Sequence, residues 1–462
     1  MKTRLQDSGL VLALCLTAWL WLGLATGAAA TTNSGGVKSP DWLRQAVVYE
    51  IFPRNFSRAG DFNSITAKLD ELKDLGVDVL WLMPIHPLGQ KMKKGSIGSP
   101  YAVRDYYGIN PDYGSTNDFK QLIAGAHARG MKVILDVVAG HTAWDSVLMA
   151  QPAFYKKDAE GKIIPPNPDW TDVAGLDYTN PDLRRYMIEM LKYWVREFGV
   201  DGFRCDVAFT VPTEFWETAH GELETIHPEV IMLADANATP ELLVKAFNMD
   251  FSDALFMAQN RVMSGVSPAV FLSQSWDNTR KKFPAGALHL RFSDKHETPR
   301  AVARLGAAGA LAAQVLMLTL DGVPLFYNGM EVGDATESAD PALFEKMPVY
   351  WTPGGRPPLR EIYRNLIKLR KAHPAFYNDN VVWLPNTVPD TVVTFQRADD
   401  QDEFVVCINL SSRPVTGAVT VPAAEKFKPL KIDGLPPIPE TTLPEFQLDG
   451  YGWRIYHRPL KP

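Results

Sequence analysis

The chain has 462 residues, of which 46% are hydrophobic and 22% are charged, close to the averages for soluble globular proteins. This composition excludes a small peptide-like scaffold, a disordered chain and a polytopic membrane protein. Lysine and arginine number 47 against 53 aspartate and glutamate, which gives a formal net charge of -6. Because such a chain has no general attraction for a polyanion, we expect no nucleic-acid partner.

The first 30 residues have the pattern of a secretory signal peptide. Lys2 and Arg4 precede an apolar run over residues 10–24, and three alanines end at Ala30. Cleavage there predicts a secreted or periplasmic protein that has no membrane contact afterwards. The alternative is an uncleaved membrane anchor, for which the apolar run is short.

Two cysteines, Cys205 and Cys407, remain after this cleavage, about 200 residues apart. A single bridge between them is not expected, and stability does not depend on a disulfide framework. No cysteine pair or His/Cys cluster has the spacing of a zinc site.

From residue 45 onwards, short apolar runs alternate with longer amphipathic segments, which is typical of βα units and a parallel sheet. The predicted strands are Ala46–Phe52, Val79–Pro84, Lys132–Val138, Gly202–Val207, Val230–Ala234, Asp250–Phe256, Ala287–Phe292 and Val323–Tyr327. The predicted helices are Ile65–Leu75, Asp118–Arg129, Asp182–Phe198, Pro212–Leu223, Pro240–Asn248, Pro268–Phe283, Thr298–Leu320 and Leu359–His373. Eight strands, each followed by a helix, predict a (β/α)8 TIM barrel over residues 31–376.

Two connections of this barrel, residues 87–116 and 141–181, are longer than the usual two to six residues and are expected to shape its mouth. After about Phe376, the runs TVVTFQR, FVVCINL, TGAVTVP and WRIYHR alternate polar and apolar residues. This pattern predicts a C-terminal antiparallel β-sandwich over residues 377–462, with the proline-rich stretch 435–443 as a loop.

Charged and polar side chains stand where several predicted strands end, and the carboxyl ends of barrel strands are where active sites lie. The residues concerned are Asp136, His141, Arg204, Asp206, Asp235, His296 and Glu297. Any one carboxylate taken alone could be a helix cap, as for Asp235. Several converging carboxylates, with an arginine and two histidines, indicate a site.

Carboxylates that share a pocket suit the cleavage of a glycosidic bond, in which one group protonates the leaving oxygen and another attacks or stabilises the anomeric carbon. Arg204 lies two residues before Asp206, so the alternation of a strand points both side chains to one face. We expect the guanidinium to hold Asp206 ionised and competent as a nucleophile.

These strand-end residues carry a resemblance to the α-amylase family, glycoside hydrolase family 13, over about residues 43–375. VVYEIFPRNF resembles the family's first strand, DVVAGH its Asp-x-Val-x-Asn-His signature, GFRCDVAFTVP its strand-four signature and LFYNGMEVG its strand-eight segment. The resemblance implies that Asp206 is the nucleophile, that Arg204, Asp136, His141 and His296 contact the substrate, and that Tyr101 stacks on the sugar at the cleavage subsite. The β-sandwich resembles the usual C-terminal domain of the family.

Two positions depart from the family pattern. Asp235 stands where the family has its glutamate acid/base, and Lys295-His296-Glu297 stands where it has Asn-His-Asp. Shortening the acid retracts it by up to ~1.5 Å, and a misplacement of about 1 Å can cost about a hundredfold in rate. Replacement by a neighbouring glutamate is not expected, since Glu214 and Glu241 fall in helices that turn away from the mouth.

The resemblance implies a glycoside hydrolase that acts on α-glucosidic bonds of starch-derived or related oligosaccharides by a retaining mechanism, with Asp206, Asp235 and Glu297 as catalytic residues. One alternative is a catalytically impaired homologue that binds α-glucans, and another is a transglycosidase that uses the same site. No cofactor is expected to be required. Gly140 replaces a calcium-ligating asparagine of the family, so no metal site is predicted there, although loop carboxylates such as Asp169 and Asp172 could bind an ion.

Overall fold

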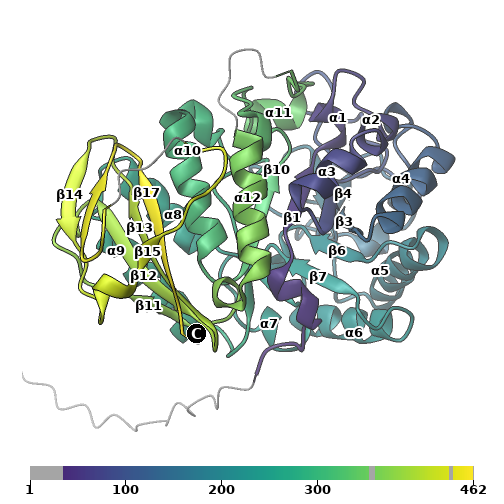
Figure 1. The fold of residues 1–462 in the computed structure, drawn as a ribbon. Helices are drawn as coiled ribbons and strands as arrows, with labels where there is room; N and C mark the ends of the chain where they lie inside the picture. The colour runs from purple at the N-terminus through teal and green to yellow at the C-terminus, as the bar shows by residue number, and fades with distance from the viewer. Residues whose placement is uncertain (1–34, 353–358, 436–440, 461–462) are drawn as a thin grey trace, which may run out of the picture.

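The computed structural model describes residues 35–352, 359–435 and 441–460, so the predicted signal peptide lies outside the described residues. Eight parallel strands close into a barrel in the order β1-β10-β9-β8-β7-β6-β3-β2, which confirms the predicted fold class (Figure 1). The barrel strands are β1 Val48–Ile51, β2 Val79–Leu82, β3 Lys132–Val137, β6 Gly202–Cys205, β7 Ile231–Ala234, β8 Met249–Phe251, β9 Leu288–Arg291 and β10 Val323–Tyr327.

Helices surround the barrel and begin at side-chain caps where the sequence provides them. Ser115 and Asp118 form a reciprocal capping box at the start of one helix, and Asn180 caps another whose first residue is Pro181. The helices are α1 Pro53–Phe56, α2 Phe62–Thr66, α3 Leu69–Leu75, α4 Thr116–Ala128, α5 Pro181–Tyr193, α6 Thr213–Glu224, α7 Leu242–Lys245, α8 Asp253–Met263, α9 Val270–Lys282, α10 Ala301–Thr319, α11 Asp340–Phe344 and α12 Leu359–Ala372.

The predicted strand Asp250–Phe256 is wrong in its second half. Strand β8 ends at Phe251, and helix α8 begins at Asp253, which makes ALFM part of a helix. Ser252 and Asp253 interrupt the apolar residues at this boundary, but periodicity over so few residues cannot separate a buried strand from a buried helix. The predicted helix Pro240–Asn248 is also longer than α7, which spans Leu242–Lys245.

The two long connections and the segment between β10 and α12 meet at the mouth of the barrel. Within the second connection, β4 (His141–Ala143) pairs with β5 (Val173–Gly175), and the Ala143 N–H donates to the Val103 carbonyl of the first connection over 2.9 Å. The Ile97 N–H donates to the Phe344 carbonyl at the end of α11 over 3.2 Å. These backbone bonds join the three segments into one wall.

The C-terminal region contains antiparallel sheets, as predicted. Strands β11 Val381–Trp383, β12 Val392–Ala398, β13 Asp402–Asn409, β17 Trp453–Pro459 and β15 Lys428–Pro429 form one sheet, and β14 Val415–Ala418 pairs with β16 Glu445–Leu448. Buried side chains of both sheets, among them Val405, Phe446 and Leu448, pack into one cluster. Figure 1 shows these sheets on one side of the barrel, and α9 and α10 contact them. Residues 436–440 of the predicted loop lie outside the described residues.

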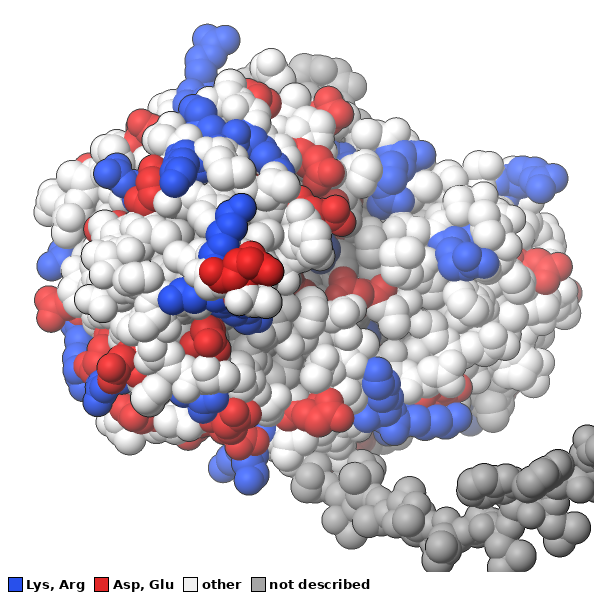
Figure 2. Space-filling model, turned by 180° about the vertical axis from the view of Figure 1, so that it is seen from behind, with Lys and Arg blue, Asp and Glu red and all other residues white. Residues whose placement is uncertain are grey.

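Helix α10 is long and apolar enough to cross a membrane, but most of it is buried between the barrel and the C-terminal sheets. Both Cys205 and Cys407 are buried and free. On the face drawn in Figure 2, acidic and basic side chains are interspersed, and the C-terminal lobe is mostly uncharged.

Candidate active site

The site lies where the inward-facing positions of the barrel change from apolar to charged. Val48 and Ile134 belong to the apolar cluster inside the barrel. The next inward positions, two residues further along each strand, are Glu50 and Asp136, both buried. The same alternation carries Arg204 into this upper layer, because Asp136 and Arg204 are register partners in β3 and β6.

Arg204 is the centre of the site and is fully buried. Its Nη1 atom donates to Asp136 Oδ1 at 3.0 Å and to Asp206 Oδ1 at 2.8 Å, and its Nη2 atom donates to Asp235 Oδ2 at 3.0 Å. The rigid guanidinium fork lets one side chain hold three carboxylates in fixed positions. The prediction that Arg204 and Asp206 point to one face is confirmed.

The ionisation of Asp206 differs from the expectation. Burial raises the pKa of Asp206, Arg204 lowers it, and the neighbouring carboxylates Asp136, Asp235 and Glu297 raise it again, with a result of about 7. Near neutral pH, Asp206 is therefore divided between its protonated and ionised forms. One arginine shared among three carboxylates does not offset their burial and mutual repulsion.

A second chain of contacts runs from Tyr101 through His296 to Glu50. The Tyr101 hydroxyl donates to Asp136 Oδ2 over 3.2 Å and lies 2.7 Å from His296 Nε2, while His296 Nδ1 lies 2.5 Å from Glu50 Oε1. Burial lowers the pKa of His296, but the Glu50 carboxylate raises it more, and the net direction is upward. A protonated His296 can therefore donate to both neighbours. Glu50 was not among the predicted site residues, although the alternation of side chains along β1 directs it to the same face as Val48.

His141 lies beside Trp170 in the cavity wall, with ring centroids 5.6 Å apart. Burial lowers the pKa of His141 to about 4, although Asp172 raises it, so the ring is neutral near pH 7. Its buried Nδ1 atom has no hydrogen-bond partner among the described residues. The ring lines the cavity, but this atom is covered by protein.

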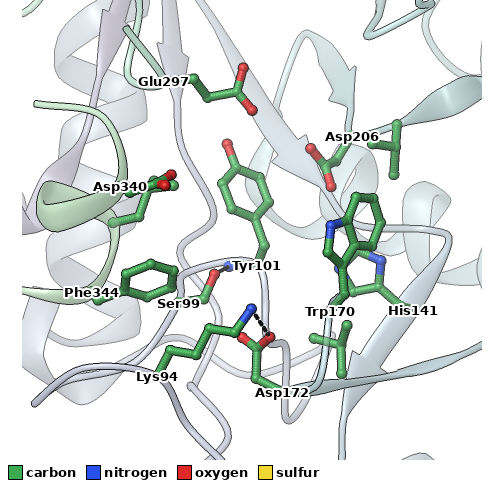
Figure 3. A pocket seen from close by; sticks show the side chains of 13 residues that line it. Lys94, Ser99, Tyr101, His141, Trp170, Asp172, Asp206, Glu297, Asp340 and Phe344 are labelled. Atoms are coloured by element: carbon green, nitrogen blue, oxygen red, sulfur yellow. Dashed lines mark hydrogen bonds and ion pairs between the residues drawn. The ribbon is translucent and has the colours of Figure 1, made fainter. Parts of the chain in front are cut away.

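The charged layer opens into a cavity of about 350 Å³, near the lower end of the range of roughly 300–1,000 Å³ for ligand sites. Figure 3 shows the Asp206 and Glu297 carboxylates pointing into the space beside the Tyr101 ring. The lining also includes Lys94, Ser99, His141, Trp170, Asp172, Val173, Val207, Asp340, Leu343 and Phe344. Aromatic faces beside carboxylates suit a ligand with flat apolar faces and many hydroxyls.

Asp235 shares the guanidinium of Arg204 with Asp206. Its Oδ2 atom accepts from Arg204 and from the Val207 N–H, the latter at 3.4 Å, and Asp235 does not belong to the lining of this cavity. Asp206 and Asp235 thus both accept from Arg204, and their side chains are 10% and 15% exposed, whereas that of Glu297 is 43% exposed.

Several functional candidates were not found from the sequence. Trp170 and Lys94 lie in the two predicted mouth insertions, but nothing in their local pattern distinguishes them from other loop residues. The Lys94 Nζ atom lies 3.2 Å from Asp172 Oδ1 and connects the two insertions across one side of the cavity (Figure 3). None of the described His, Cys, Asp and Glu side chains form a group of three arranged to hold a metal ion.

A family model described as alpha amylase, catalytic domain, matches residues 34–160 and 169–352. Among curated proteins, the chain is 29% identical to "Alpha-amylase MalA" from Haloarcula japonica, covering 84% of this chain and 60% of that protein. It is 26% identical to "Maltogenic alpha-amylase" from Bacillus acidopullulyticus, covering 84% of this chain and 73% of that protein. The chain thus spans less than two thirds of the first of these relatives.

Solved structures agree over most of the chain. The maltogenic alpha-amylase AmyB from Thermotoga neapolitana superposes with a TM-score of 0.81 at 28% identity, covering 90% of this chain and 99% of that one. An alpha-amylase from Lactobacillus plantarum gives a TM-score of 0.80 at 31% identity, with the same coverage of 90% and 99%.

Proposed function

Because the chain belongs to the alpha-amylase family, we propose that it is a glycoside hydrolase that cleaves α-glucosidic bonds of starch-derived or related oligosaccharides with retention of configuration. The observation that carries this proposal is the contact between Arg204 and Asp206 at the base of a cavity lined by aromatic rings. Relatives named as a maltogenic alpha-amylase and a cyclomaltodextrinase support the substrate class.

The reaction proceeds in two displacements. A carboxylate oxygen of Asp206 attacks the anomeric carbon, the bond to the glycosidic oxygen breaks, and Asp235 gives its proton to that oxygen. Water then attacks the glycosyl ester, its proton passes to Asp235, and Asp206 leaves as a carboxylate. Two inversions at one carbon give net retention.

The remaining polar groups bind the sugar and stabilise the positive charge of the transition state. Glu297 at the cavity wall and Asp136 beneath it supply negative charge, and the His141 ring lies in the cavity wall beside the sugar. Both ring nitrogens of His296 are engaged by Tyr101 and Glu50, so this residue acts on the sugar through Tyr101. Tyr101 offers a ring face to the sugar.

Short oligosaccharides fit this cavity better than long chains. Its volume of about 350 Å³ is small for a ligand site, and the ion pair between Lys94 and Asp172 lies across one side. We infer that substrate chains are bound close to one of their ends.

A second candidate function is favoured by the position of Asp235. Asp235 accepts from Arg204 and from the Val207 N–H and is one methylene shorter than a glutamate, so its carboxylate reaches less far towards a leaving oxygen. In that case the protein is a catalytically impaired homologue that binds α-glucans.

The test is the release of reducing ends from maltooligosaccharides by the wild type and by Asp206→Asn, with calorimetric titration of maltotetraose on both. Hydrolysis by the wild type that falls at least about a thousandfold in the variant supports the enzyme. Binding without hydrolysis supports the second candidate. Absence of both rejects the substrate class.

A further inference from the structure

Lys295 is a buried cation at the rim of the site to which sequence analysis gave no role. The residue is 8% exposed, and its Nζ atom lies 5.0 Å and 5.4 Å from the ring centroids of Phe251 and Phe292. Its backbone N–H donates to Thr298 Oγ1 over 3.1 Å. The two aromatic faces thus hold the ammonium group, and the backbone bond holds the main chain from which it extends.

The ammonium group lies between two carboxylates from different elements. Glu297 Oε2 is 2.7 Å from Nζ, and Asp253 Oδ1, in the first turn of α8, is 3.6 Å away. The other oxygen of Glu297, Oε1, is 3.9 Å from His296 Nε2. Among the described contacts of the Glu297 carboxylate, the ion pair with Lys295 is therefore the shortest.

Glu297 needs such a partner because it lines the cavity on a long side chain that is 43% exposed. A glutamate side chain in open solvent samples many rotamers. Figure 3 shows its carboxylate directed towards the space that Asp206 also faces. A fixed ammonium at 2.7 Å selects this orientation.

We propose that Lys295 is a positioning residue that clamps the Glu297 carboxylate at the cavity wall, where this carboxylate faces the sugar bound above Asp206. The inference rests on the proposed function, since it assigns a role within the same site. An ionised carboxylate held there stabilises the oxocarbenium-like charge of the transition state.

The charges around Glu297 agree with this role. Partial desolvation raises the pKa of Glu297, but His296, Lys295 and Arg204 together lower it more, and the net direction is downward. The acids Asp206, Asp235 and Asp253 and the Tyr101 hydroxyl also face this part of the site. Without Lys295, repulsion from these acids would weigh more, and the pKa of Glu297 would rise.

The test compares Lys295→Met, which retains a long side chain between the two rings, with Lys295→Arg, which retains the charge. We expect kcat on maltotetraose to fall about ten- to a hundredfold in Lys295→Met and less than about threefold in Lys295→Arg. Lys281→Met, at an exposed lysine of α9, is the matched control and should leave kcat unchanged.

Two measurements separate positioning from a merely structural role. When Glu297 is already changed to Gln, Lys295→Met should cause no further loss, because both changes act through one carboxylate. Titration of carboxyl-labelled glutamate by NMR should show a higher pKa for Glu297 in Lys295→Met than in the wild type. Additive losses, or an unchanged pKa of Glu297, would overturn the proposal.

Failure of the proposed function has a different signature. If the wild type hydrolyses no α-glucan, that function fails, and the NMR titration still decides whether Lys295 controls Glu297. If the wild type is active and Lys295→Met retains full kcat, only the role of Lys295 is rejected.

Discussion

The Nη2 atom of Arg204 lies 3.0 Å from Oδ2 of Asp235, so the side chain proposed to protonate the leaving oxygen is held by the same guanidinium that holds the nucleophile. Lengthening this side chain by one methylene lets the carboxylate reach past Arg204 towards the cavity. We therefore predict that Asp235→Glu raises kcat on maltooligosaccharides at least about tenfold.

Steady-state kinetics of the wild type, Asp235→Glu and the double variant Asp235→Glu, Glu297→Asp check this prediction. Glu241→Asp, at an exposed glutamate that follows β7, is the control and should leave kcat unchanged. A lower kcat in Asp235→Glu would mean that the site is adapted to the shorter side chain.

The pH dependence of activity follows from Asp206. Burial and neighbouring carboxylates raise the pKa of Asp206 to about 7, and only the ionised form can attack the anomeric carbon. We predict that kcat/KM falls about tenfold for each pH unit below this value. A rate profile that stays flat from pH 7 to pH 5 would contradict the raised pKa of Asp206.

The raised pKa of Asp206 lowers activity at low pH, but it makes the folded protein more stable at low pH than at high pH. The folded protein binds the Asp206 proton more tightly than the unfolded chain does, so this group stabilises the fold fully at low pH and loses that contribution as the pH rises through about 7. Asp206→Asn removes a charge that is unfavourable above this pH. We predict a gain in the free energy of unfolding on the order of 1 kcal/mol at pH 8, and a smaller gain at pH 5.

Urea unfolding of the wild type and Asp206→Asn at the two pH values measures this difference. Asp277→Asn, at an exposed aspartate of α9, is the control. A variant less stable than the wild type at pH 8 would show that Arg204 keeps Asp206 favourably ionised.

The ion pair between Lys94 and Asp172 predicts how chain length is selected. Lys94→Ala removes one contact between the two mouth insertions, the one that lies across this side of the cavity, so longer chains can pass there. We predict that the ratio of kcat/KM for maltoheptaose to that for maltotriose rises about tenfold. Lys91→Ala, in the same insertion and exposed, should leave the ratio unchanged. Equal ratios in Lys94→Ala and the wild type would place the chain-length limit elsewhere.

The barrel could be predicted because its strands are short apolar runs separated by amphipathic segments, and all eight predicted strands contain or overlap an observed one. The contact between Arg204 and Asp206 was also predictable, because it depends only on the alternation within one strand. The boundary after Phe251 was not, since periodicity over so few residues does not distinguish the buried strand β8 from the first turn of α8.

Contacts that need the closed barrel could not be predicted. Glu50 on β1 contacts His296, which follows β9, although the two residues are 246 apart in sequence. Lys295 forms an ion pair with Asp253, which begins helix α8 but was predicted to lie in a strand. The position of Asp235 depends on how β6 and β7 pair, with Cys205 opposite Ala234.

The most direct test of the central claim is to trap the covalent intermediate. The protein is incubated with a slowly reacting 5-fluoro-α-glucosyl fluoride, digested and examined by mass spectrometry. We predict that the peptide containing Asp206 carries one added fluoroglucosyl group, and that this peptide stays unmodified in Asp206→Asn. A wild type that hydrolyses maltooligosaccharides but carries the adduct on another carboxylate, such as Glu297, would contradict the account.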